Sequence, residues 1–209
     1  MGSSFLTVLH SGLALFAGLA FFKLIIQYGR PNHPLKVISY LTTFAVFLLI
    51  LGDPLADLGF ISAWDWIKWQ TLPLMASCFG LIFEIIMVLG GFNQLQQKIM
   101  TRLPLLAALL GYTFLKEHLQ IIIPVTLIFC LFLLIFSTKN LAFFRRVFIK
   151  MTIMLGLSSL LLNYGAWNFQ WLRAILLYFS FFYFYLYQQG LAAISLVDSF
   201  HNDQMEETK

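Results

Sequence analysis

Long apolar segments that follow one another almost without interruption constrain this 209-residue chain more than any other feature. A transmembrane helix needs about 20 consecutive, mostly apolar residues. Windows of this kind fill nearly the whole chain and leave no stretch long enough for a soluble domain. The mean hydropathy of +0.85 is also far above what a soluble domain of this length can hide in one core. The sequence therefore predicts an all-α, polytopic transmembrane helix bundle.

Apolar runs bounded by charged residues, or by Pro and Gly, predict seven spans. These lie near residues 5–27, 35–52, 71–92, 102–115, 119–137, 147–164 and 172–197. The fourth run is short for a span and also fits a re-entrant or interfacial segment. We therefore expect one transmembrane domain over residues 1–197, followed by a short acidic cytoplasmic tail over 198–209.

The distribution of basic residues between the spans predicts the orientation of the chain. With seven spans, most Lys and Arg side chains fall on one side: Lys23, Arg30, Lys36, Lys98, Arg102, Lys139, Arg145, Arg146 and Lys150. The other side receives Lys68, Lys116 and Arg173. Because the basic side of a membrane protein is cytoplasmic, the N-terminus is predicted outside and the C-terminus inside. The expected location is the cell membrane, and specifically a bacterial inner membrane.

The longest loop on the outer side follows the second predicted span. It begins with Asp53 before Pro54, an order typical of a helix start. It also carries three tryptophans that are typical of an aromatic belt on a short interfacial helix, namely Trp64, Trp66 and Trp69. Asp53 and Asp57 lie one helical turn apart, so they also fit an outer vestibule that attracts cations. Helix capping explains Asp53 equally well.

One carboxylate, Glu84, lies in the middle of the third span, in the stretch GLIFEIIMVLGG. Alternating steps of four and three residues place it on a stripe of small or polar residues: Pro73, Ser77, Gly80, Glu84, Met87 and Gly91. Such a face is suited to close helix packing. A carboxylate at this depth is costly unless it is paired, protonated or in contact with water. We therefore expect Glu84 to face protein, and Glu84 and Ser77 to be candidate cavity or pathway residues.

Similar stripes on the last two spans complete the candidate pathway. The sixth span places Asn163 on a face of small and polar residues. The seventh places Tyr178 and Tyr185 on an aromatic face whose hydroxyls could line a cavity. Each stripe taken alone is more often ordinary helix packing.

Two histidines on the outer side, His10 and His118, are weak candidates for a haem or metal site. The usual alternative is a packing donor for His10 and a solvated loop position for His118. No nucleophile, zinc-helix or phosphate-loop motif occurs in the chain, so the sequence assigns no catalytic residue. No cofactor is predicted, with haem as the weaker alternative.

Three functional classes remain after these exclusions. The first is a small carrier or channel for a small polar or cationic solute that uses the membrane-depth carboxylate. The second is a non-catalytic subunit or sensor of a membrane complex, in which the same stripes dock a partner membrane protein or a second copy. The third and weakest is a haem- or quinone-binding protein. Because the basic residues lie in short loops between spans, they indicate topology and no nucleic-acid role.

Overall fold

The computed structural model describes residues 2–28, 34–62, 65, 69–90, 96, 99, 101–115, 119–137, 141–164 and 170–207, and α-helix is the regular secondary structure in these residues. No strand occurs in these residues, in agreement with the predicted all-α class. Seven helices are described: α1 (Gly2–Tyr28), α2 (Pro34–Asp57), α4 (Thr71–Leu89), α6 (Leu103–Leu115), α7 (Leu119–Ile135), α8 (Ala142–Tyr164) and α9 (Gln170–Glu207).

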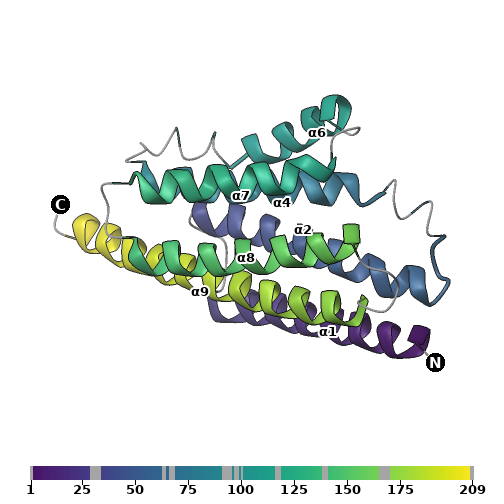
Figure 1. Ribbon diagram of the computed structural model, residues 1–209. Coiled ribbons are helices and arrows are strands. Elements are labelled where there is room, and N and C mark those ends of the chain that lie inside the picture. The colour runs from purple at the N-terminus through teal and green to yellow at the C-terminus, as the bar shows by residue number, and fades with distance from the viewer. Residues whose placement is uncertain are drawn as a thin grey trace.

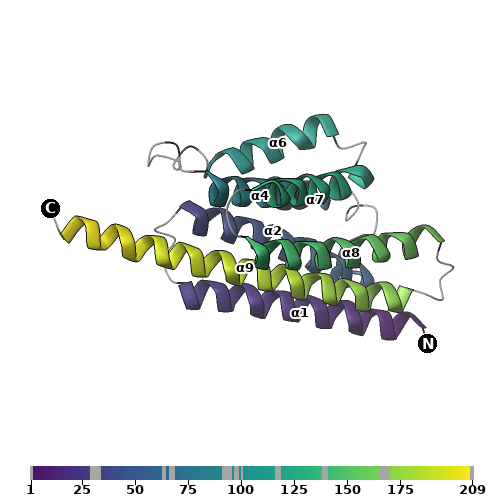
Figure 2. The ribbon, with the colours of Figure 1, turned by 60° about the vertical axis from the view of Figure 1, so that its left-hand side comes forward.

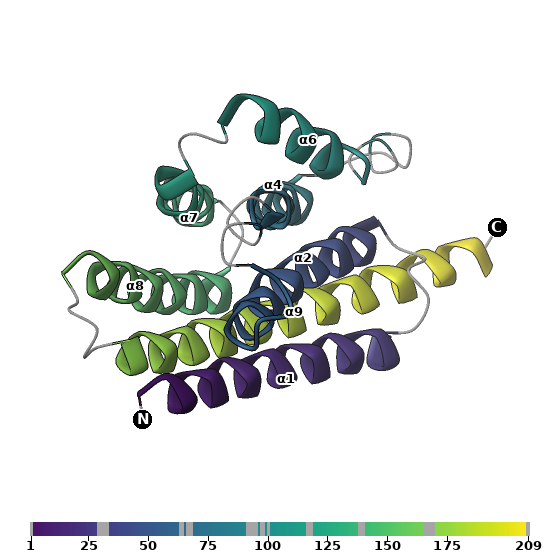
Figure 3. The ribbon, with the colours of Figure 1, turned by 90° about the vertical axis from the view of Figure 1, so that its right-hand side faces the viewer.

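Six of these helices form a bundle, and α6 lies on its surface (Figures 1 to 3). Around the bundle, α1 contacts α2, α2 contacts α4, α4 contacts α7, α7 contacts α8, α8 contacts α9, and α9 returns to α1. Helices α2 and α9 also contact each other, and α6 packs against α4. The chain termini lie at opposite ends of the molecule (Figure 1). We call these the N-terminal end and the C-terminal end of the bundle.

The membrane prediction is supported by helix length and by the exposed side chains. Within the described residues, three helices are long and apolar enough to cross a membrane, namely Phe5–Gln27 of α1, all of α2, and α4. A row of large apolar side chains on α1 faces outward: Val8, Leu15, Leu19, Phe22 and Ile26. Such a row fits a lipid-facing surface. These helices suggest a membrane location.

The lengths of the remaining helices do not establish which of them span the membrane, so the number of spans stays a prediction. α6 has 13 residues, which cover about 20 Å and fall short of a hydrocarbon core of about 30 Å. α7 has 17 residues, at the lower limit for a span. α9 has 38 residues and extends beyond the bundle at the C-terminal end (Figure 2). Its helix thus continues into the predicted acidic tail.

The prediction that a new helix begins at Asp53 and Pro54 is wrong, because α2 continues through Pro54 to Asp57. The proline ring removes one backbone hydrogen bond, and membrane helices tolerate this where nearby groups satisfy the freed carbonyl. The helix ends at Asp57, and in the turn that follows Gly59 has a φ of 77°, which belongs to the left-handed region. In the loop that follows, residues 63, 64 and 66–68, and with them Trp64 and Trp66, lie outside the described residues.

Candidate functional site

A cavity of about 310 Å³ lies inside the six-helix bundle, in the half that includes the N-terminal end. Its walls come from α1, α2, α4, α7, α8 and α9, and most of the lining side chains are apolar. Small-molecule sites generally have volumes of about 300 to 1,000 Å³ and mainly apolar walls with a few polar groups. The cavity therefore has the size and character of a site for a small ligand.

Four half-buried polar side chains border the cavity where its helices begin or end. His10 lies near the start of α1, Asp53 near the end of α2, Gln70 just before α4, and Arg173 in the first turn of α9. We call these four residues the polar mouth. Because each of them lines the cavity and is also partly exposed, the mouth is the side on which the cavity meets solvent.

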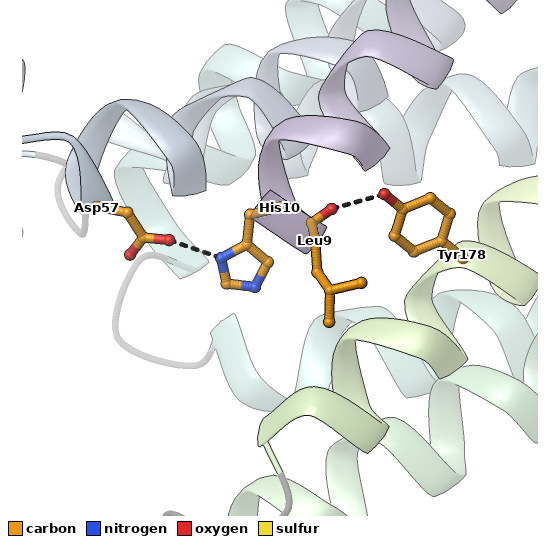
Figure 4. Close-up of polar contacts among 4 residues, drawn as sticks. All are labelled: Leu9, His10, Asp57 and Tyr178. Carbon is orange, nitrogen blue, oxygen red and sulfur yellow. Dashed lines mark hydrogen bonds and ion pairs between the residues drawn. The ribbon is translucent and has the colours of Figure 1, made fainter. Parts of the chain in front are cut away.

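The first helix is held at the mouth by contacts with both of its neighbours (Figure 4). His10 Nδ1 lies 2.8 Å from Asp57 Oδ2, which joins α1 to the end of α2. The Tyr178 hydroxyl donates a hydrogen bond of 2.6 Å to the Leu9 carbonyl, which joins α9 to α1. A Cβ atom at Gly12 would collide with this hydroxyl, so the glycine permits the contact.

A buried hydrogen-bonded cluster lies beyond the inner end of the cavity. Gln188 Nε2 donates to both carboxyl oxygens of Glu84, at 3.0 and 3.3 Å, and both side chains are fully buried. Ser39 Oγ donates to the Oε1 atom of the same Gln188. Since these residues belong to α2, α4 and α9, the cluster ties three helices together. We call Ser39, Glu84 and Gln188 the polar layer.

Two further hydroxyl groups lie beside the Glu84 carboxyl. Thr42 and Tyr187 are both close enough to interact with it. The Thr42 hydroxyl donates to the Ile38 carbonyl at 2.9 Å. The Tyr187 hydroxyl is buried and makes no hydrogen bond of ordinary geometry with the described residues. Its ring packs edge-on against the ring of Phe148, with the ring centres 5.1 Å apart.

The cavity and the polar layer lie one after the other along the same helices. Leu81 of α4 and Phe184 of α9 line the cavity, and Glu84 and Gln188 follow them by about one helical turn. Glu84 itself does not line the cavity. The polar layer therefore lies next to the inner end of the cavity, and none of its three residues lines the cavity.

The structure brings together some of the residues that the sequence selected. Ser77, Asp53 and His10 line the cavity, and Asp57 is joined to His10. Glu84 is fully buried and hydrogen-bonded, which confirms the expectation that it faces protein.

The other selected residues lie elsewhere. Tyr178 contacts α1, and Tyr185 lies under the ammonium group of Lys23, which is 5.7 Å from its ring centre. Neither tyrosine is among the cavity-lining residues. Asn163 belongs to α8, but its side chain lies outside the description, and so does the whole of His118. The weak haem or metal role of His10 and His118 thus stays a prediction. No group of three His, Cys, Asp or Glu side chains in the described part of the chain is placed to hold a metal ion.

The sequence reasoning missed several residues that the structure places at the site. Ser39 and Thr42 are polar residues in an otherwise apolar span, and this was the available signal for their burial beside Glu84. Arg173 was treated only as a topology marker, although it borders the cavity. Gln188 falls at the same helical spacing as the aromatic face of the last span, but a single sequence could not identify Glu84 as its partner.

The fold and site define a helical bundle of membrane type with an internal cavity and a buried polar layer around one carboxyl group. Comparison with models of known families, with curated proteins and with solved structures finds no match for this chain.

Proposed function

We propose that this protein is a small membrane carrier that binds its solute in the cavity. The observation that carries the proposal is a ligand-sized cavity in one half of the bundle, next to a fully buried polar layer. A channel needs a continuous path, whereas a carrier exposes its site to one side at a time. A site that is bordered by solvent at one end and by buried side chains at the other fits the second description.

The distribution of charge supports a mouth that faces outside. Arg145, Arg146 and Lys150 lie in the first half of α8, which starts at the C-terminal end of the bundle, and Lys36 begins α2 at the same end. Arg173 lies at the mouth. Under the positive-inside rule, this asymmetry favours a cytoplasmic C-terminal end and an outward-facing cavity.

The cavity walls favour a mainly apolar solute with one polar group. The polar or cationic solute expected from the sequence depended on Glu84 lining a pathway. Glu84 instead belongs to the polar layer and does not line the cavity, whereas Leu81 and Phe184 do. Burying apolar surface of a ligand provides about 25 cal/mol per Å², so an apolar body gains most from these walls.

The two cysteines of the chain provide a direct experiment and its control. Cys78 lines the cavity, whereas Cys130 is fully buried and does not. Cys130→Ser leaves only the cavity thiol, and Cys78→Ser leaves only the buried one. A membrane-impermeant methanethiosulfonate is added to right-side-out or inverted vesicles, and the rate of thiol loss is measured.

A carrier predicts that Cys78 reacts from both sides, because the cavity must face each side in turn, while Cys130 stays unreactive until the protein unfolds. Reaction from the outside alone would identify a receptor pocket and contradict the carrier. Equal reaction of both thiols would contradict a cavity of this shape.

One observation favours a second candidate, a non-catalytic subunit or sensor of a larger complex. α9 extends past the bundle to Glu207, and this extension contains the acidic end of the sequence. An acidic helix beyond the membrane domain is suited to bind a basic cytosolic partner. Purification of the full chain from its native membrane in mild detergent tests this, with removal of residues 198–209 as the control: loss of a stable partner on truncation would support the second candidate.

A further inference from the structure

The guanidinium of Arg173 is the unusual group of the polar mouth. It lines the cavity, and its Nε atom is shielded from solvent with no hydrogen-bond acceptor among the described residues. Arginine has five N–H donors in a planar fork that matches a carboxylate. A shielded donor without an acceptor is costly, so a ligand oxygen at this position would satisfy it.

The helix ends around the mouth add to the positive charge of Arg173. α4 and α9 both begin there, and neither has an acidic residue in its first turn. Gln70 precedes α4 without making a side-chain capping bond. The start of a helix carries about half a positive charge and is normally balanced by an acid. Arg173 stands where that balancing acid would usually be, so the site favours an anion.

Asp53 is the group that competes with an external anion. Its carboxylate lines the same cavity and lies close enough to attract the Arg173 guanidinium. An internal ion pair is thus the simplest alternative use of Arg173. That alternative leaves the Nε donor without an acceptor. The second acid of α2 at this end, Asp57, contacts His10 and does not line the cavity.

We propose that the solute of the cavity is a small apolar molecule that carries a carboxylate, and that Arg173 binds this carboxylate. The inference rests on the proposed function, because it names the solute class of the same cavity. The volume of about 310 Å³ is roughly twice that of a cavity known to hold benzene. It therefore suits an aromatic or branched aliphatic body with a short acidic arm. The body lies among the apolar walls, and the carboxylate lies at the mouth.

The first experiment measures the charge preference at the mouth without a known ligand. The Cys130→Ser protein is treated with methanethiosulfonates that carry either an ethylsulfonate or an ethyltrimethylammonium group. In both reactions the Cys78 thiolate attacks sulfur, a mixed disulfide forms and methanesulfinate leaves. The ratio of the two rates therefore cancels the intrinsic reactivity of the thiolate.

When each rate is divided by the rate with a free thiol, the anionic reagent should react faster with Cys78 than the cationic reagent. Arg173→Gln should lower this anionic-to-cationic ratio about tenfold, because a unit charge close to the path is removed. Arg173→Lys retains the positive charge and should keep most of the preference for the anionic reagent. It provides the second test of this charge if the glutamine variant folds poorly. Arg146→Gln, an exposed arginine on α8, is the matched control and should leave the ratio unchanged. A ratio that is the same with and without Arg173 would overturn the inference.

The second experiment identifies the ligand class by protection of Cys78 from labelling. The probes share a phenyl body: 3-phenylpropanoate, its amide 3-phenylpropanamide, 2-phenylethylamine and phenylalanine. We expect protection by 3-phenylpropanoate at concentrations about ten- to a hundredfold lower than for the amide, and loss of this difference in Arg173→Gln, because the variant removes a charge-assisted hydrogen bond. Stronger protection by phenylalanine would assign the carboxylate to an amino acid whose ammonium group meets Asp53.

The outcomes separate this inference from the proposed function. Equal protection by the acid and the amide would overturn the carboxylate while leaving an apolar binding cavity in place. Protection by the amine alone would overturn it in favour of a cation at Asp53. Failure of Cys78 to react with either reagent in the folded protein would overturn the cavity function itself, and the inference with it.

Discussion

Replacing Glu84 by leucine tests whether the polar layer stabilises the bundle. The substitution removes both acceptors of Gln188 Nε2, which then lies buried without a partner. An unsatisfied buried donor costs about 1 to 3 kcal/mol. The leucine gains little in compensation, because apolar packing between helices has no hydrophobic driving force when the alternative surroundings are lipid. The loss therefore exceeds the gain.

Thermal denaturation in mild detergent provides the measurement, with exposure of the fully buried Cys130 thiol as the readout. For a chain of this size, 1 kcal/mol corresponds to about 2 to 4 °C. The Glu84→Leu midpoint should thus fall by roughly 2 to 12 °C. Glu84→Gln keeps one acceptor oxygen at nearly constant volume, so its midpoint should fall by less than half as much.

The double variant Glu84→Leu with Gln188→Leu separates hydrogen bonding from packing. Removing both partners leaves no unsatisfied amide, and such paired replacements are often close to neutral. The double variant should therefore be more stable than Glu84→Leu alone. A Glu84→Leu protein as stable as wild type, or a double variant that loses the sum of both single effects, would refute the role assigned to the polar layer. A Glu84→Gln protein that folds but no longer shows two-sided Cys78 labelling would assign the charge itself to transport.

Further perturbations test the packing, the mouth and the topology. Gly80→Ala should lower the thermal midpoint, because its Cβ would meet the Thr42 side chain. The Cβ of Gly156→Ala on α8 meets nothing within 4 Å, so this variant should raise stability by about 0.5 to 1 kcal/mol. Tyr178→Phe removes the hydrogen bond to the Leu9 carbonyl and should cost about 0.5 to 1.5 kcal/mol in the same thermal assay. A reporter fused after the C-terminus should be active only in the cytoplasm, and one placed in the loop between α2 and α4 only outside; the reverse at either site contradicts the orientation.

Long apolar runs made most of the helices predictable. Their length and hydropathy locate α1, α2 and α4 to within a few residues, because a membrane-length helix has to satisfy its own backbone hydrogen bonds. The ends were less predictable. Pro54 is a strong local signal for a helix start, yet α2 continues through it, since one missing hydrogen bond costs less than breaking a buried helix.

The candidate site was predictable only where a single residue type carried the signal. Glu84 stood out because a carboxylate in an apolar span is rare, and its protein-facing position followed from helical periodicity. Its partner could not be identified, because Gln188 lies 104 residues away in the sequence and the spacing within one helix says nothing about contacts between helices. The same limit applied to the cavity, which six helices form together.

The mouth and the polar layer share three helices, which in the proposed carrier would link binding to opening. α2 contributes Asp53 and Ser39, α4 contributes Gln70 and Glu84, and α9 contributes Arg173 and Gln188. On each helix the two positions are separated by about 21 to 23 Å of continuous helix. The proposed carboxylate ligand, by drawing Arg173 toward it, would act on the same stiff helix that holds Gln188 against Glu84. Three side chains joined by hydrogen bonds have two discrete states, joined or separated, which is the kind of bistable contact that carries a shift from one end of a protein to the other. The polar layer is therefore the contact that must break if the cavity is to open toward the C-terminal end.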